Sequence, residues 1–445
     1  MTRILIILIG WLLVAGCDAK RKTEADTELP LFTSIPKLSE LNLKLSDVII
    51  SDIFTPPVAS RIYAYANIAA YEANRFENEE STSLSVKLNG LSTPPLPNEQ
   101  AKYDFQMAGA VAFMTTARSL VYDASAIEQI ETNYLSLAAK TDIGEGIYNR
   151  SIEFGRSIGE HILDWANADG YNQRTSNMAY IVNSEAGRWQ PTPPDYAEAI
   201  EPHWNTLRPF LLDSANQFNP GSPTSFEIAQ ESAFYQGAVE VYQVVRSINE
   251  EQLAIAKFWD CNPNISHTNG HVMYYDQQIS PGGHWIHIAC QVIEAEDLVE
   301  AKSAEVLAKL SLTLADAFIS CWDEKYRSSL IRPETYINRY IDEDWQPILQ
   351  TPAFPEHTSG HSVASSSAAT ILTHFFGEAY HLQDSTEVPF GLPIRAFDSF
   401  FEASNEAAIS RLYGGIHYMP AIEKGVDQGK KLGRFVINKL IESEN

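Results

Sequence analysis

The sequence predicts an all-α protein built as a bundle of helices. Apolar residues recur at helical spacing in many long segments, and no run of alternating β-branched residues is long enough to form a central sheet. The chain has 445 residues, of which 44% are hydrophobic and 20% are charged, which is ordinary globular composition with ample residues for a core. We therefore expect one helical catalytic unit over residues 31–445.

The first half of the predicted bundle consists of four helices and a long connecting segment. Two prolines, Pro56 and Pro57, precede the first helix and are good helix starters. The four helices are expected at residues 58–75, 101–122, 124–139 and 147–168. Residues 171–224 are rich in Asn, Pro, Ser and Trp and predict a long ordered loop, a kind of segment that often carries function.

The second half of the bundle is interrupted by an irregular segment at residues 260–285. Asn, Gly, Pro and His residues in that segment break the helical spacing. Seven helices are expected around it, at residues 226–246, 250–259, 286–296, 300–322, 363–376, 397–413 and 421–441.

The N-terminus predicts a targeting segment. Residues 4–14 are nearly all apolar, a run that is short for a membrane span and typical of a signal peptide. The residues LVAGC at 13–17 resemble a bacterial lipobox, and an ordinary signal peptide with a chance cysteine is the alternative. We expect a signal peptide at 1–16, a lipidated tether at 17–30, and an exported periplasmic or outer-membrane lipoprotein whose only membrane attachment is a lipid at Cys17.

Charge and cysteine content exclude several other classes of protein. The formal net charge is −25, and such a surface repels nucleic acid, so a nucleic-acid partner is excluded. No protein partner is implied. The cysteines beyond the tether are Cys261, Cys290 and Cys321, and no CxxC pair indicates a zinc ribbon or a redox site. One disulfide is possible in an exported protein, but buried free thiols are favoured.

Three segments in the last third of the chain carry the chemistry. The first contains Lys325, which closes a long apolar helix, and Arg332, whose backbone should be extended because Pro333 follows it. The side chains of both cations should extend from the end of the helix towards the same side. A solvated basic helix terminus, stabilised by the helix dipole, is the alternative interpretation of this segment alone.

The second segment is a turn that leads into the small-residue helix at 363–376. A helix N-terminus offers unpaired N–H groups and the positive end of a dipole, which favours an oxyanion site. Ser359 adds a hydroxyl donor, Gly360 lets its N–H approach a ligand closely, and His361 exchanges protons near neutral pH. A plain serine-capped helix is the alternative.

The third segment places Arg411 and His417 on either side of Gly414-Gly415. A lone histidine is usually a satisfied structural residue, but an arginine and a histidine around a double glycine favour a site. Together the three segments supply three cations, two histidines and several N–H or hydroxyl donors. This set matches the three negatively charged equatorial oxygens of a trigonal-bipyramidal phosphate or vanadate.

The order of these segments resembles the signature of the vanadium haloperoxidases and the type 2 phosphatidic-acid phosphatases, which share one helical-bundle active site. The resemblance covers residues 322–417. Trp322 and Phe354 stand where haloperoxidases place the aromatic residues that line the vanadate pocket. The lipobox, residues 55–65 and residues 280–285 are similar to the bacterial branch that includes vanadium-dependent iodoperoxidases.

The resemblance implies a role for each site residue. His417 would bind the metal of vanadate, in which vanadium remains V, and His361 would act as acid and base at the opposite apical oxygen. Lys325 would also polarise bound peroxide. The substrates would be hydrogen peroxide and a halide, with iodide most favoured, bromide open and chloride least favoured. The residues that would hold the equatorial oxygens are Lys325, Arg332, Ser359, Gly360 and Arg411.

One departure from the pattern bears on a second hypothesis. Related phosphatases and many haloperoxidases carry an acidic residue four positions after the final histidine, and here Ala421 stands there. The acid orients a nucleophilic histidine, so its absence argues against the alternative of an acid phosphatase acting through a phosphohistidine on His417. Glu423 or a backbone carbonyl is the expected partner of His417. A non-catalytic phosphate-binding lipoprotein is a third hypothesis.

Two further hypotheses come from the irregular segment. The histidine pairs His267/His271 and His284/His287 have spacings that bind zinc on a helix, but glycine and proline interrupt or precede them. We expect these residues to form the wall of the site entrance instead. Asp260 is a candidate hydrogen-bond partner for a catalytic group.

Overall fold

A computed structural model describes residues 31–78, 81–176, 179–263, 265–269, 272–275 and 277–441. The expected signal peptide and lipidated tether at 1–30 lie outside these residues, and the chain from residue 31 onwards packs as one unit. The predicted all-α class is confirmed: in the described part of the chain, strands form only two short antiparallel ribbons. None of the helices described there is both long and apolar enough to cross a membrane.

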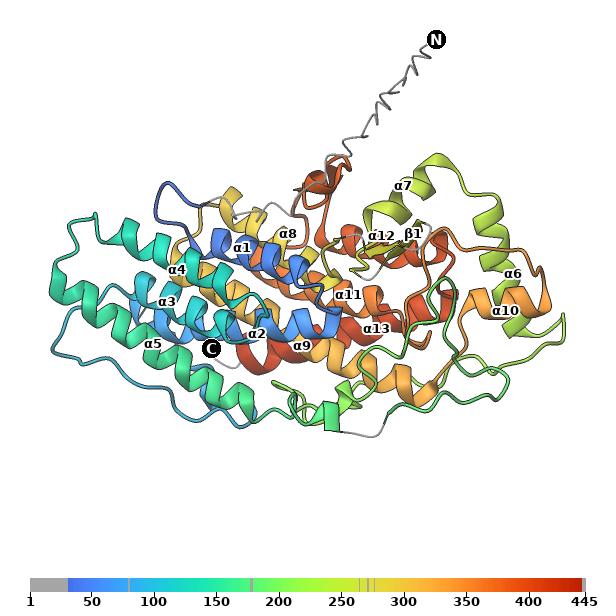
Figure 1. Ribbon diagram of the computed structural model, residues 1–445, viewed down its shortest axis with the longest axis horizontal. Helices are drawn as coiled ribbons and strands as arrows, with labels where there is room; N and C mark the ends of the chain where they lie inside the picture. The colour runs from blue at the N-terminus through green and yellow to red at the C-terminus, as the bar shows by residue number, and fades with distance from the viewer. Residues whose placement is uncertain are drawn as a thin grey trace, which may run out of the picture. The chain divides into compact units, whose positions relative to one another are not determined.

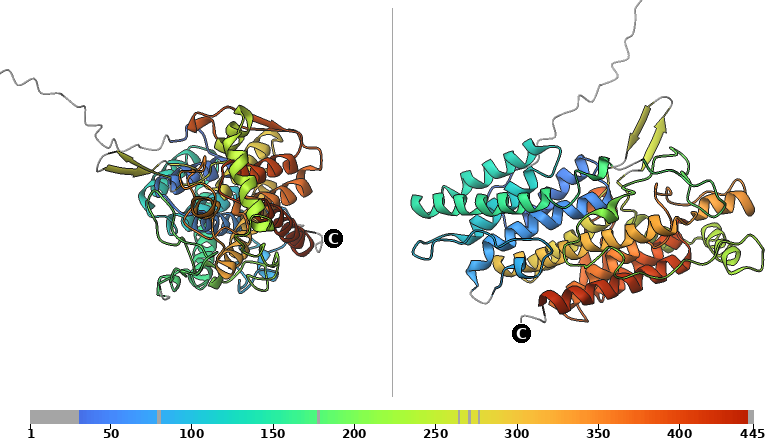
Figure 2. Two further views of the ribbon diagram at one scale, coloured as in Figure 1. Left: turned by 90° about the vertical axis from the view of Figure 1, so that its right-hand side faces the viewer. Right: turned by 90° about the horizontal axis from the view of Figure 1, so that it is seen from below.

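The elements follow the chain from α1 to α13. The helices are α1 (Leu38–Ser51), α2 (Pro56–Asn74), α3 (Phe105–Arg118), α4 (Ala124–Ala138), α5 (Glu145–Asn167), α6 (Ala233–Arg246), α7 (Glu250–Phe258), α8 (Pro281–Ala295), α9 (Glu300–Ser328), α10 (Pro333–Tyr340), α11 (Gly360–Phe376), α12 (Phe400–Tyr413) and α13 (Met419–Val436). The ribbons pair β1 (Ser266–Asn269) with β2 (Val272–Tyr275), and β3 (Leu382–Asp384) with β4 (Arg395–Phe397). The β1–β2 ribbon projects away from the helices in both views of Figure 2.

Two helices of the structure were not predicted, and several others begin or end at residues that differ from the predicted ones. The structure adds α1 and the short α10. Helix α8 starts at Pro281 instead of residue 286, because the Ser280 hydroxyl caps the Gly283 N–H and proline takes the first helical position. Helix α9 continues six residues past Trp322, ending at left-handed Ser329, so Lys325 lies in its last turn.

Helix α2 forms the centre of one half of the bundle. Every residue from Pro56 to Asn74 is buried, and the helix packs against α3 and α9. Helices α3, α4 and α5 lie at one end of the bundle, and α6, α7 and α10 lie at the other (Figure 1). The long α9 is buried along most of its length and links the two halves.

Helices α11 and α13 make the closest helix pair of the second half. Three glycines of α13, Gly425, Gly429 and Gly433, follow each other at a spacing of four residues and face the small residues of α11. A Cβ atom on Gly429 would lie 2.2 Å from the Ser366 hydroxyl and 2.3 Å from the Val363 carbonyl oxygen. Only glycine permits this approach, which holds the N-terminus of α11 beside α13.

The predicted long ordered loop is confirmed for its described residues, and it runs over the C-terminal end of α9. Trp189 and Trp204 are buried in this region. The Trp189 backbone N–H donates to the Ser329 carbonyl at 2.8 Å, and the Ile331 N–H donates to the Gly187 carbonyl at 2.9 Å. The loop thereby fixes the chain between α9 and α10, from which Lys325 and Arg332 extend.

Candidate active site

Lys325 lies fully buried at the end of α9, with its side chain turned towards the second segment. Its ammonium donates to the carbonyl oxygens of Pro355, Glu356 and Thr358 at 3.0, 3.1 and 2.5 Å. Burial lowers the pKa of Lys325 to about 7. The lysine therefore orders the turn before α11 and is poised between its neutral and charged forms.

Arg332 is the N-cap residue of α10, with the extended backbone that Pro333 predicted. Its Nε donates to the Phe354 carbonyl at 2.9 Å and its Nη1 to the Ile416 carbonyl at 2.9 Å. Its Nη2 is shielded from solvent and has no hydrogen-bond partner among the described residues. Burial lowers the pKa of Arg332 to about 10, so the guanidinium remains charged at neutral pH.

Ser359 is the N-cap of α11, which starts at Gly360, three residues before the predicted residue 363. Its hydroxyl oxygen accepts from the Ser362 N–H at 3.3 Å and from the Ser362 hydroxyl at 2.8 Å. A Cβ on Gly360 would lie 3.7 Å from the Trp322 ring and 4.0 Å from the Lys325 Cε. The start of α11 therefore lies directly beside the buried lysine.

His361 and Arg411 face a common cavity with Gly360, His417, Trp322 and Phe354. The His361 Nε2 is shielded from solvent and unpartnered among the described residues. Desolvation, and then the charge of Arg411, lower the pKa of His361 well below its usual range, so it is neutral. The Arg411 Nη2 donates to the Trp259 carbonyl at 2.6 Å, and burial lowers the pKa of Arg411. Asp260 also lines this cavity, and its charge favours the charged form of Arg411.

His417 is held by a carboxylate that the sequence did not reveal. Its Nδ1 lies 2.8 Å from the Glu356 Oε1, and its Nε2 lies 3.2 Å from the Arg332 Nη1. An arginine only donates, so Nε2 is the accepting nitrogen and Nδ1–H donates to Glu356. Burial, and then the charges of Arg332 and Lys325, lower the pKa of His417 well below its usual range. The imidazole is neutral, with a lone pair on Nε2 that faces the cations.

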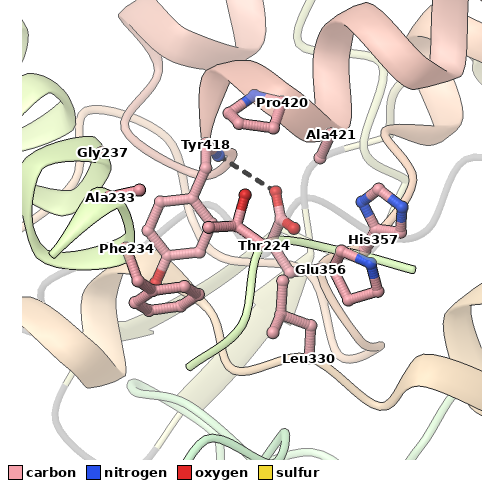
Figure 3. A pocket seen from close by; sticks show the side chains of 11 residues that line it. Thr224, Ala233, Phe234, Gly237, Leu330, Glu356, His357, Tyr418, Pro420 and Ala421 are labelled. Carbon is pink, nitrogen blue, oxygen red and sulfur yellow. Dashed lines mark hydrogen bonds between the residues drawn. The ribbon is translucent and has the colours of Figure 1, made fainter. Parts of the chain in front are cut away.

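Glu356 replaces the acid that is missing at Ala421. Its Oε1 also accepts from the Tyr418 N–H at 3.0 Å (Figure 3). Burial raises the pKa of Glu356 to about 7 against the opposing charges of Arg332 and Lys325. The prediction that Glu423 is the partner of His417 is wrong, because the Glu423 side chain is exposed. The alternative prediction of a backbone carbonyl is also wrong, because the His417 Nδ1 pairs with the Glu356 carboxylate. Position 356 lies within the second motif, and its acidic side chain three residues before Ser359 was the available signal.

A second cavity adjoins this pair. Glu356, His357 and Tyr418 line it together with Phe234 and Leu330 (Figure 3). The Glu356 Oε2 is buried without a hydrogen-bond partner among the described residues. The paired His417 and Glu356 therefore each face a different cavity: His417 faces the one that contains the site cations, and Glu356 faces one that is mostly apolar.

The two predicted aromatic residues lie together at the site. The rings of Trp322 and Phe354 are 4.9 Å apart. The Phe354 ring lies 4.9 Å from the Lys325 ammonium and 5.0 Å from the Arg332 guanidinium. The aromatic faces thus cover two of the cations and keep water from them.

Of the two histidine pairs, which we expected to form the wall of the site entrance instead of zinc sites, only His284/His287 has both side chains among the described residues. His271 and the side chain of His267 lie outside the described residues. His284 and His287 do lie on α8, but the metal-type cluster among the described residues joins His284 to Cys261 and Glu387, without His287. The three cysteines among the described residues are buried and free, as favoured from the sequence.

The residues brought together fit a tetrahedral oxyanion such as vanadate or phosphate. Lys325, Arg332 and Arg411 supply positive charge, and the Arg332 Nη2 and His361 Nε2 are polar atoms shielded from solvent that have no partner in the described part of the chain. Unpaired buried polar atoms are costly unless a ligand satisfies them. The Gly360 position and the helix N-terminus leave N–H groups for the same ligand.

Comparison with known proteins supports this interpretation. A family model described as the VCPO second helical-bundle domain matches residues 305–443. The crystal structure of the first bacterial vanadium-dependent iodoperoxidase is similar with 44% identity and a TM-score of 0.86, covering 93% of this chain and 98% of that chain. No curated protein matches the sequence.

Two bacterial vanadium-dependent chloroperoxidase structures are similar at lower identity. The holo form has 14% identity and a TM-score of 0.68, covering 92% of this chain and 99% of that chain. The apo form has 13% identity and a TM-score of 0.65, covering 88% of this chain and 96% of that chain. At this identity the likeness is one of fold.

Proposed function

Because this chain belongs to the vanadium-dependent haloperoxidase family, we propose that it oxidises a halide with hydrogen peroxide to hypohalous acid, with vanadate held on His417. One observation carries the proposal. Glu356 keeps the proton on the His417 Nδ1, so Nε2 is unprotonated and accepts from the Arg332 Nη1. A neutral imidazole in one tautomer, placed among buried cations, is the form that ligates a metal centre.

Different side chains of the site would neutralise the charge of the anion, donate hydrogen bonds to it and transfer protons. Lys325, Arg332 and Arg411 neutralise its charge, while Ser359 and Gly360 donate from the start of α11. Vanadate, when bound, supplies a Lewis acid that activates peroxide without changing its own oxidation state. His361 is neutral, so its Nε2 can accept a proton from peroxide and later return it.

Halide oxidation by the desalted protein, with and without added vanadate, tests the proposal. We expect turnover only with vanadate and none in His417→Ala, which removes the ligating nitrogen. His381→Ala is the matched control, because that histidine is exposed and pairs with Asp398. Retained turnover in His417→Ala contradicts the assignment.

Iodide is the proposed preferred halide. The support is the 44% identity to a protein named as an iodoperoxidase, together with the ease with which iodide is oxidised. We expect turnover to fall from iodide to bromide, with chloride lowest. A profile in which chloride is oxidised as fast as iodide contradicts this preference.

Glu356 also gives a specific reason to retain the phosphatase alternative. The acid that orients the histidine was missing from the predicted position but is supplied from residue 356. Hydrolysis of a phosphomonoester that vanadate inhibits, without halide oxidation, favours that function. Tight phosphate binding without turnover in either assay favours the non-catalytic alternative.

We also propose that the protein is exported as a lipoprotein attached at Cys17, in the periplasm or on the outer membrane. The support is the apolar run at 4–14 and the LVAGC sequence at 13–17. Expression of Cys17→Ala should move the protein from the membrane fraction to the soluble fraction. Equal membrane retention of both forms contradicts lipid attachment at this residue.

A further inference from the structure

Three potential metal ligands from separate elements converge beside the active site. Cys261 follows α7, His284 lies in the first turn of α8, and Glu387 follows β3, and all three are buried. The His284 Nδ1 lies 3.4 Å from the Cys261 Sγ and 3.2 Å from the Glu387 Oε1. All three ligand atoms lie within 4.8 Å of one another.

The two distances from the His284 Nδ1 are those of a tetrahedral zinc site. With ordinary zinc–ligand bond lengths, a tetrahedral centre places nitrogen about 3.5 Å from sulfur and about 3.4 Å from oxygen. The two contacts of the His284 Nδ1 are each within roughly 0.2 Å of these separations. A single ion can therefore contact His284 together with Cys261 or Glu387 with little movement, and the remaining separation, between the Cys261 and Glu387 ligand atoms, is no more than 4.8 Å.

The far side of His284 is arranged as metal-bound histidines require. Its Nε2 lies 2.6 Å from the Asp384 Oδ2, and Asp384 is itself held by the Thr386 N–H at 2.9 Å. A carboxylate on one ring nitrogen keeps the proton there and directs the other lone pair to the metal. The Trp259 ring stacks on His284 with centroids 4.5 Å apart and fixes the ring plane.

We propose that Cys261, His284 and Glu387 bind one Zn²⁺ ion, with Asp384 as the residue that positions His284. The thiolate and the carboxylate balance the two charges of the ion, and the thiol proton is released to solvent on binding. Three protein ligands leave the fourth position for water. Softer thiolate ligation favours zinc over calcium or magnesium.

The proposed ion would stabilise the structure around the active site and would take no part in catalysis. Cys261 lies two residues after Trp259, whose carbonyl accepts from the Arg411 Nη2 at 2.6 Å. Cys261 also lines the cavity that contains His361 and His417. Zinc would thus tie the segment that holds Arg411 to α8 and to the segment after β3.

Metal titration of the full chain after chelator treatment and desalting tests the proposal. We expect one equivalent of Zn²⁺ per chain by elemental analysis, and a thiolate-to-cobalt charge-transfer band when Co²⁺ is used as the probe. Cys261→Ala should lose the band and the bound metal, whereas Cys290→Ala, which removes another buried free thiol, should keep both. Asp384→Asn should weaken Zn²⁺ binding about 10–100-fold.

A folding readout keeps the two cysteine variants comparable. Zn²⁺ should raise the thermal unfolding midpoint of the wild type and of Cys290→Ala, and should leave that of Cys261→Ala unchanged. Absence of bound metal in the folded wild type overturns the proposal and leaves His284 as an imidazolium between Asp384 and Glu387. A cobalt spectrum that is identical in Cys261→Ala also overturns it.

Discussion

The direction of the His417 ring depends on one buried carboxylate. Glu356 accepts from Nδ1–H and from the Tyr418 N–H, so the ring cannot turn its Nε2 away from Arg332 without losing a hydrogen bond. The two residues are 61 positions apart. Phosphatases place the acid that orients the histidine four residues after it. Here Glu356 of the second motif makes the corresponding contact with His417.

Substitution of Glu356 should weaken the cofactor site while leaving the ligating nitrogen in place. In Glu356→Gln we expect vanadate affinity to fall about 10–100-fold, because the carboxylate no longer selects the tautomer. Equilibrium dialysis against vanadate measures the change. Glu423→Gln is the control, since that side chain is exposed, and equal losses in both variants contradict the role of Glu356.

Anion binding should weaken as the pH rises above 7. Lys325 has a pKa lowered to about 7 and Glu356 a pKa raised to about 7, so at higher pH the site loses a positive charge and gains a negative one. A bound anion raises the pKa of Lys325, so binding takes up a proton and affinity falls by up to about tenfold per pH unit for each linked proton. Sulfate, which does not titrate in this range, is the probe for calorimetry.

A charge-retaining variant separates the two contributions. Lys325→Arg keeps a cation across this range, so the part of the pH dependence that comes from Lys325 should disappear and the part from Glu356 should remain. A wild-type affinity for sulfate that is constant from pH 6 to 9 is inconsistent with the low pKa of Lys325.

At the scale of elements, the position of the α11 N-terminus depends on α13. A Cβ on Gly425 would lie 2.8 Å from the Ser362 Cβ and 3.0 Å from the Ser359 carbonyl oxygen. The Thr358 hydroxyl donates to Gln428 of α13 at 2.8 Å, and Gln428 donates to Ser320 of α9 at 3.0 Å. Helix α13 therefore joins α9 and the site turn into one packed unit.

Gly425→Ala should lower both stability and anion affinity, because the added methyl pushes against the residues that start α11. We expect a loss of about 1–3 kcal/mol in the free energy of unfolding. Gly155→Ala is the matched control: its Cβ would lie 2.4 Å from the Ala108 carbonyl, in the α3–α5 contact. That variant should lose comparable stability, but its folded form should bind sulfate as the wild type does.

At the scale of the whole molecule, the charge of the surface opposes the charge of the site. The chain carries a formal charge of −25, while three buried cations lie at the site. Iodide must cross the negative potential of the surface before it meets them. We therefore expect the KM for iodide to fall as ionic strength is raised with sodium nitrate, because salt screens the repulsion.

Hydrogen peroxide is the internal control for this prediction, because a neutral substrate does not respond to the surface potential. Its KM should stay constant over the same range of sodium nitrate. A KM for iodide that rises with salt indicates local attraction by Arg411 and Lys325 instead of repulsion by the surface.

Much of the fold was predictable because helical spacing is a local property. The long amphipathic segments, the helix that Pro56 and Pro57 introduce, and the extended backbone of Arg332 all follow from neighbouring residues. Helix α10 was missed because it has only eight residues, too few to show a period. Helix α9 was predicted too short because its last turn carries charged residues whose burial no local pattern indicates.

The sequence by itself determined the helical class and the set of cations, donors and histidines that the three motifs contribute, because residue type and short spacing are enough to state what chemistry each segment offers. Only the tertiary structure decided which carboxylate orients His417 and that Cys261 meets His284 and Glu387. The physical reason is that contacts between residues far apart in the chain depend on how helices pack, and that packing is set by close approaches such as that of Gly429 to Ser366.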